Sequence, residues 1–212
     1  MITQIEQALA ERLQRGLGQL VSTVKSYGGE LDRESLGTSR LPMCLVTFGD
    51  SRIERIGTNA KRHQSTANFV IIVAVNSLRS NLAARQGGAD KREVGVNQLI
   101  TAVRRLLDSQ TLGQLVKPLK PNKVSTIFNN AKFKGGAITA YAIEYDAVYD
   151  DFPPLEDGLF PEENRDVENP DYVFTHYQGE HSEPAPILER VGGNIYDPMS
   201  GAQVPFEVET KK

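Results

Sequence analysis

Apolar residues fill both alternating sets of positions in one segment, TANFVIIVAVN, residues 66–76. Phe69 and Ile71 fall on one face of an extended chain, and Val70 and Ile72 fall on the other. A strand that is apolar on both faces is typical of the interior of a sheet. The pattern therefore predicts a central strand.

Three further segments have extended character. Pro42 precedes MCLVTF, residues 43–48, which predicts a strand with a proline at its start, where no ladder hydrogen bond is needed. VSTIFNN and AITAYAIEYDAVYDDF flank AKFKGG, which predicts a hairpin with its turn at Gly135-Gly136. In the last strand Glu144 and Asp146 lie on the face opposite the tyrosines.

Two segments show helical spacing. Thr3 and Glu6 have the spacing of a capping box, and Gly16 and Gly18 are expected to end the first helix. The first apolar stripe is Ile2, Ile5, Leu9 and Leu13, and the second is Val96, Leu99, Ile100, Val103, Leu106 and Leu107. Helix, strands, helix and strand hairpin together predict an α+β fold, a mostly antiparallel sheet with two main helices packed on it.

Residues 49–64 form a basic cluster between two predicted strands, either a hairpin tip or a long loop. Its basic side chains include Arg52, Arg55, Lys61 and Arg62. No aromatic residue stands among them to stack on bases. We therefore favour an acidic protein surface as their partner over nucleic acid.

Charge divides the chain into two parts. Residues 1–150 carry 20 Lys and Arg against 13 Asp and Glu, whereas residues 151–212 carry 4 against 14. Eight of the eleven prolines also lie in this second part, which has no periodic apolar run. We predict one domain, the body (1–152), followed by an acidic, proline-rich arm (153–212) that is extended or becomes ordered on assembly.

The arm carries spaced aromatic residues, the type that often dominates interfaces. The candidate anchors are Tyr172, Phe174, Tyr177, Tyr196 and Phe206. The segment GGNIYDPMSGAQVPFEV has turn signals at Asp197-Pro198 and Ser200-Gly201 between short apolar runs. It is expected either to add a strand to a neighbour's sheet or to stay disordered until assembly.

Signatures of catalysis and cofactor binding are absent from the sequence. No phosphate-binding loop, nucleophile elbow or paired metal-ligand motif occurs, and Cys44 stands alone in an apolar run. His176 and His181 are expected to be exposed rather than metal ligands. Asp50 and Glu54 with Lys61 are the nearest approach to a metal-dependent nuclease, with loose spacing. We expect no enzyme, metal, cofactor or membrane-spanning segment.

Several sequence segments resemble those of one protein family. ITQIEQALAERL, SYGGEL, LPMCLVTFGD, ANFVIIVAVNS, GVNQLITAVRRLL and YAIEYDAVYDDF together are similar to a small protein of Mu-like phages and prophages. The gene for that protein lies just before the contractile sheath gene. The resemblance covers most of residues 1–150 and has no counterpart for residues 155–212.

The resemblance implies a structural role in the virion. The expected protein is a tail terminator, a hexameric ring at the head-proximal end of a contractile tail. Its expected partners are its own copies, the tail tube and sheath proteins and a neck or head-completion protein, with non-specific contact to DNA in the channel. It would assemble in the host cytoplasm. Another head-tail connector, or less plausibly the nuclease or a DNA-binding module, is the alternative.

Overall fold

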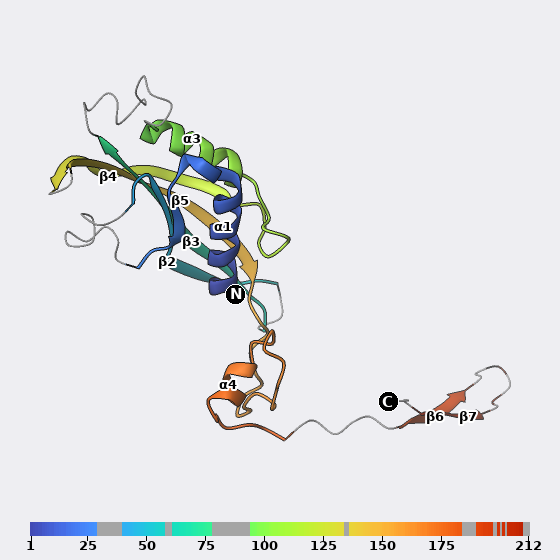
Figure 1. Cartoon of the computed structure of the whole chain (residues 1–212). Helices are drawn as coiled ribbons and strands as arrows, with labels where there is room; N and C mark the ends of the chain where they lie inside the picture. The colour runs from blue at the N-terminus through green and yellow to red at the C-terminus, as the bar shows by residue number, and fades with distance from the viewer. Residues whose placement is uncertain are drawn as a thin grey trace. The chain divides into compact units, whose positions relative to one another are not determined.

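The computed structural model describes residues 1–28, 40–57, 61–77, 94–133, 136–183, 190–196, 199, 201 and 203–209 (Figure 1). The chain divides into two compact units, the body (Met1–Pro153) and the arm (Pro154–Lys212). The predicted turns at Gly135, Asp197-Pro198 and Ser200 lie outside the described residues.

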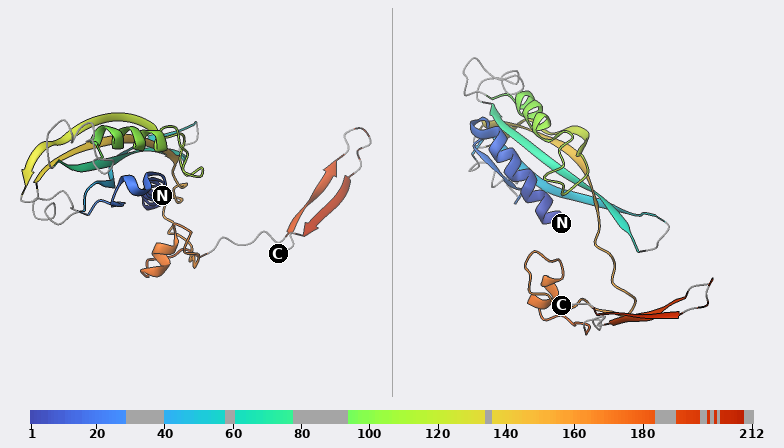
Figure 2. Two further views of the ribbon diagram at one scale, coloured as in Figure 1. Left: turned by 45° about the horizontal axis from the view of Figure 1, so that its top comes forward. Right: turned by 90° about the vertical axis from the view of Figure 1, so that its right-hand side faces the viewer.

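A five-stranded sheet forms the centre of the body (Figures 1 and 2). Its strands are β1 (Thr23–Ser26), β2 (Met43–Arg55), β3 (His63–Ser77), β4 (Lys120–Phe133) and β5 (Gly136–Asp150). They lie in the order β1-β2-β3-β5-β4, and every neighbouring pair is antiparallel except the parallel pair β1 and β2. The predicted α+β class and the central position of β3 are confirmed.

Two helices, α1 (Ile2–Leu17) and α3 (Val96–Leu107), cover one face of this sheet. A short 3₁₀ turn, Gly18–Leu20, follows α1. The main core joins the two helix stripes to alternate residues of the central strands; its members include Ile5, Leu9, Leu13, Leu99, Val103, Phe69, Ile71 and Tyr145. A second, smaller core lies on the other face; it includes Met43, Leu45, Ile72, Ala74, Ile138 and Ala140. These two cores explain why β3 is apolar on both sides.

A hydrogen-bonded group joins the end of α3 to the sheet. The buried Tyr145 hydroxyl donates to Asp108 Oδ1 at 2.7 Å, and Arg104 donates to Asp108 Oδ2 at 2.8 Å. Burial and the neighbouring Asp108 carboxylate raise the pKa of Tyr145 far above its ordinary value. Both carboxylate oxygens of Asp108 therefore accept a hydrogen bond, which fixes the end of α3 at this residue.

The boundaries of α1 differ from the prediction. The Ile5 amide already donates to the Met1 carbonyl at 3.0 Å, so the helix begins at Ile2 and Thr3 lies inside it. The predicted capping box is therefore wrong, since no side chain caps this terminus. Gly18 does end the helix, with a φ of 50°, whereas Gly16 lies within its last turn.

Gly16 allows α1 and α3 to approach each other closely. A methyl group at this position would overlap the Leu106 side chain of α3. We expect Gly16→Ala to lower the free energy of unfolding by about 1–3 kcal/mol, although alanine favours a helix by about 1 kcal/mol. Urea unfolding measures this, with the exposed Gln14→Ala of the same helix as the control. An unchanged or raised stability of Gly16→Ala would show that Leu106 moves aside freely.

Cys44 should make stability depend on alkaline pH. Burial raises the pKa of its thiol from 9.0 to about 12. Above pH 9.0 the thiol ionises in the unfolded chain but keeps its proton in the folded chain, so stability falls as pH rises towards 12. The expected contribution is a loss of about 1.4 kcal/mol per pH unit.

Comparing unfolding of the native chain and Cys44→Ala below and above pH 9.0 isolates this contribution. Both proteins contain Tyr145, whose raised pKa adds a similar alkaline loss to each. The native chain should lose stability more steeply. Parallel pH profiles would contradict the assignment to Cys44.

Candidate subunit interface

The basic cluster of residues 49–64 is a hairpin rather than a long loop. β2 runs on past Phe48 through a register shift to Arg55, and Ser51–Arg55 pair with His63–Ala67 of β3. Arg52 and Arg55 are exposed on this extension, with no ion pair among the described residues. The predicted strand at 43–48 was therefore too short.

The other two basic residues lie across the turn of this hairpin. Lys61 and Arg62 are exposed just before β3, and Arg62 reaches Asp150 Oδ2 at 3.6 Å. Gln64 also donates to Asp150, at 2.7 Å. Arg62 is therefore already engaged by the end of β5, while Arg52 and Arg55 have no ion pair among the described residues.

The first part of the arm is folded rather than extended. α4 (Tyr172–His176) lies in a loop whose ends are joined, because the Phe160 amide donates to Ser182 Oγ at 2.8 Å. The Asn164 amide also donates to Thr175 Oγ1, at 2.9 Å. The prolines of the arm did not reveal these bonds, which are made by small polar side chains.

The predicted aromatic anchors of this loop remain accessible. Tyr177 is 75% exposed and Phe174 44%, while Tyr172 is half-buried and stacks on His176. His181 contacts the Pro161 carbonyl through its ring nitrogen. The loop therefore uses its histidines in local contacts, including an edge contact of His176 with Tyr177, and leaves Phe174 and Tyr177 largely exposed.

The second part of the arm is a two-stranded hairpin, β6 (Arg190–Tyr196) and β7 (Gln203–Glu209). The two strands flank the segment in which the sequence shows turn signals. Its register pairs Tyr196 with Gln203 and Gly193 with Phe206, which places the two predicted anchors on opposite faces.

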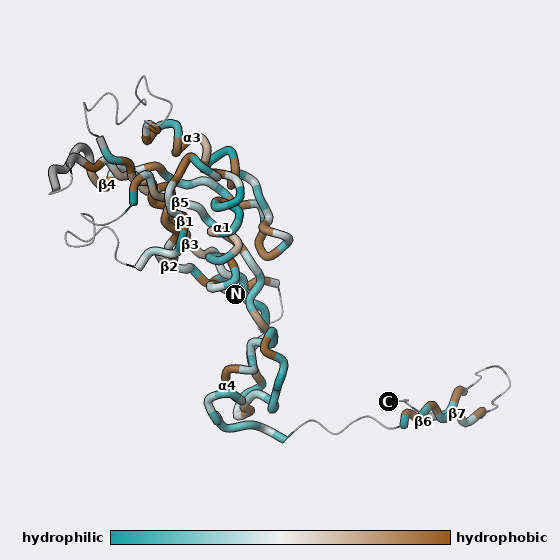
Figure 3. Tube along the Cα trace, in the orientation of Figure 1, coloured by the Kyte–Doolittle hydropathy of each residue, from teal (hydrophilic) through white to brown (hydrophobic). Residues whose placement is uncertain are grey.

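One face of the β6–β7 hairpin is apolar and the other is polar. The apolar face holds Val191, Ile195, Val204, Phe206 and Val208, all at least 40% exposed. Arg190 on the polar face reaches Glu207 at 3.2 Å and Glu209 at 3.4 Å. Figure 3 shows the resulting alternation of hydrophobic and hydrophilic residues. Aromatic residues alone were predicted as anchors, so the aliphatic residues of this face are not among the predicted sites.

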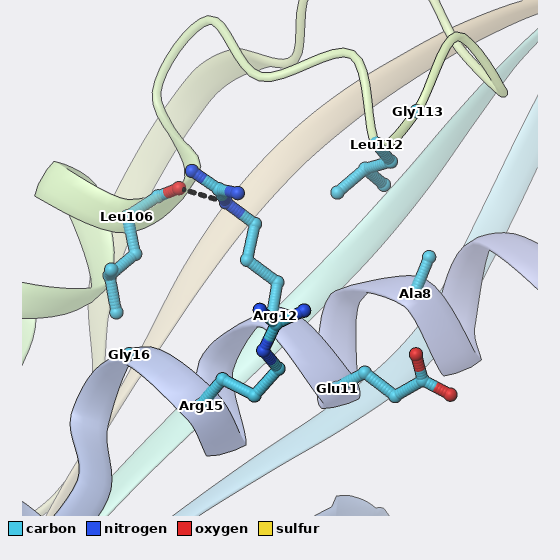
Figure 4. Close-up of a pocket in the computed structure, with 8 residues that line it drawn as sticks. All are labelled: Ala8, Glu11, Arg12, Arg15, Gly16, Leu106, Leu112 and Gly113. Atoms are coloured by element: carbon cyan, nitrogen blue, oxygen red, sulfur yellow. Dashed lines mark hydrogen bonds between the residues drawn. The ribbon is translucent and has the colours of Figure 1, made fainter.

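A hollow of about 410 Å³ lies between α1 and the turn after α3 (Figure 4). Arg12 is held at its wall, since its Nε donates to the Leu106 carbonyl at 2.7 Å. Arg15 and Glu11 line the same hollow from α1. The hollow presents mixed charge and backbone carbonyls, a lining that suits a polar partner surface, and the sequence analysis gave no sign of it.

The candidate nuclease residues lie in another place, on the sheet face away from the helices. Asp50, Glu54, Glu144 and Asp146 line one hollow of about 430 Å³ together with Arg52. Within the described residues, however, no three carboxylate, histidine or cysteine side chains are grouped so that they could hold a metal ion. The Asn68 amide instead donates to Asp146, at 3.5 Å.

Comparison with protein families identifies the body. The family model described as bacteriophage Mu, Gp37, matches residues 1–150. The chain belongs to the bacteriophage Mu Gp37 family. The resemblance seen in the sequence is therefore confirmed, and it makes this chain a tail-related protein of the phage virion. A search of curated proteins gave no match.

The Gp37 match and the structure divide the chain at nearly the same place. The match ends at residue 150, where β5 ends, and the arm follows as a separate unit. In the described parts of this Gp37 family member, no helix combines the length and apolar composition needed to cross a bilayer. The family match thus concerns the sheet and its two helices, and the arm lies outside it.

Proposed function

We propose that the protein is a non-enzymatic tail terminator, forming a ring at the head-proximal end of a contractile tail and joining it to the neck. The observation that carries this proposal is the Gp37 family match over the whole body. The position of the related genes before the sheath gene favours a component of the upper tail. The partners required by this role are the tail tube and sheath proteins on one side and a neck or head-completion protein on the other.

The surfaces of the chain support self-assembly. In a cyclic ring every interface joins two different surfaces of the subunit, which must complement each other. The basic residues 1–150 and the acidic residues 151–212 supply opposite charges, which favour correct encounter and register. The exposed aromatic and aliphatic side chains of the arm supply apolar contacts. We propose a hexamer on the basis of the terminator role.

The location of the protein in the particle tests this function. Gold-labelled antibodies against the body are applied to purified free tails and free heads, which are then imaged by electron microscopy. A terminator places gold at one end of the tails, opposite the baseplate, and leaves the heads unlabelled. Label on the heads instead would assign the protein to the head side of the neck and contradict the proposal.

A further inference from the structure

The β6–β7 hairpin is incomplete as a folded element. A two-stranded hairpin in water is marginally stable at best, and it needs further strands or a packed face to persist. All residues of β6 and β7 are exposed, including the five apolar side chains of one face. The Phe206 ring packs against Gly193, where an added methyl group would lie 3.0 Å from it. The hairpin therefore has a defined apolar face and lacks a packing partner for it among the described residues.

The two outer edges of this hairpin differ in their ability to accept a strand. Pro205 stands in β7 opposite Asn194 and has no amide hydrogen to donate. Proline is tolerated in a strand where its own nitrogen faces away from the ladder. The outer edge of β7 therefore lacks a hydrogen-bond donor at Pro205. β6 contains seven residues and no proline. The free edge of β6 is thus the side that can pair with another strand.

The body has a matching free edge on β2. β1 pairs with β2 only at Met43–Val46, whereas β2 continues to Arg55. After the register shift, Ser51–Arg55 pair without interruption with β3 on their inner side. Among the described residues no strand occupies their outer side. This five-residue edge therefore presents unpaired backbone groups.

Side chains on this β2 edge suit a partly apolar strand. Ile53 is 65% exposed and lies on the helix side of the sheet, in the row of Ser65 and Tyr149. β6 presents the aliphatic side chains of Val191 and Ile195 to such a neighbour. The β2 edge carries Arg52, Glu54 and Arg55, and the only charged residue of β6 is Arg190, so apolar pairing with Ile53 is the main side-chain contact. The acidic charge of the arm as a whole favours its encounter with the basic body.

The other long edge of the sheet, β4, is less suited to pairing. Pro121 removes one donor, and the pairing of β4 with β5 contains three register shifts. The longest regular run between these shifts, Lys123–Thr126, is shorter than the β2 run. Bulges, prolines and lysines are features by which proteins protect sheet edges.

We propose that β6 of one copy adds as an extra strand to the Ser51–Arg55 edge of β2 in a second copy. The proposal rests on the assembly role above and specifies which surfaces join the subunits. The chain length between the body and the hairpin, residues 151–159 and 183–189, sets an upper limit on its reach on the order of 50 Å. A body of this size has a radius of gyration of about 15 Å, so an adjacent copy lies within that reach.

Cysteine cross-linking between two differently substituted chains tests this pairing. Full-length Ile53→Cys and a tagged full-length Ile195→Cys are mixed at the highest concentration at which both stay dissolved, and treated with a short bis-maleimide. Both sites are more than 60% exposed, so neither substitution disturbs a core. The native Cys44 is buried with a raised pKa and does not react at neutral pH.

The expected result is a cross-linked heterodimer of distinct mass, with no such product from Val124→Cys on β4 mixed with Ile195→Cys. Absence of the Ile53–Ile195 product, or a product with Val124 instead, would overturn the proposal. A single chain carrying both Ile53→Cys and Ile195→Cys is treated in the same way. A cross-link formed within that chain, with no heterodimer from the mixture, would show that the arm pairs with its own body, which also overturns the proposal. The gold-labelling result is independent of this pairing, so failure of one does not imply failure of the other.

Discussion

Deleting residues 154–212 is expected to leave a folded body that no longer assembles. Every member of the main core lies in residues 1–153, the last being Tyr149. The free energy of unfolding should therefore stay within about 0.5 kcal/mol of the full chain. Assembly should be lost, because the deletion removes the acidic partner of the basic surface and the apolar hairpin face together.

Thermal unfolding and native mass spectrometry separate these two effects. The truncated and full-length chains are compared for midpoint temperature and for the fraction of protein in rings, alone and with purified tail tubes. A truncated chain that assembles as fully as the whole chain would refute the role of the arm. A truncated chain that fails to fold would contradict the division into two units.

Val204→Asp should abolish assembly while leaving the body intact. Val204 is the second residue of β7 and lies on the apolar face, paired with Ile195. Burying an unpaired carboxylate at an interface costs about 3–5 kcal/mol, which is at least about a hundredfold in the association constant. Sedimentation of the full-length variant measures this loss.

Gln203→Asp is the matched control for that variant. Gln203 is the preceding residue of the same strand, but it lies on the polar face with Tyr196. The two variants have the same charge and differ only in the face that carries it. If both weakened assembly equally, general repulsion would be the cause, and the apolar face would have no particular role.

The core of the fold follows from its apolar pattern. The two-sided run around Ile71 and Ile72 can be buried on both faces only in a central strand, and the Val96–Leu107 stripe matches a helix lying on a sheet. The end of β2 was not predictable in this way. Residues 52–55 are exposed and mostly polar, so backbone pairing with β3 extends the strand without an apolar pattern.

Two local errors have particular physical causes. Thr3 and Glu6 have capping-box spacing, but the helix already begins at Ile2, and spacing alone cannot show which turn comes first. Glycine commonly ends helices, yet Gly16 lies inside α1. There it allows Leu106 to pack closely against the helix. A glycine required for close packing and a glycine required for a turn are indistinguishable by residue type.

The candidate interaction surfaces could be proposed from residue type but not assigned to a face. Aromatic residues make the arm a candidate partner-binding segment, and the turn signals lie between the two strands of its hairpin. Whether Tyr196 and Phe206 share a face depends on the register, which short-range sequence does not determine. The free edge of β2 likewise depends on where β1 ends, which is a property of the folded sheet.

The central claim, a terminator of the phage tail, is tested most directly by the tails that form without this protein. The measurement is electron microscopy of lysates from the parent phage carrying a nonsense mutation in this gene. The account predicts filled heads beside unattached tails of abnormal length. Tails of normal length beside unjoined heads would contradict a terminator role, and intact particles would exclude any essential part in joining head and tail.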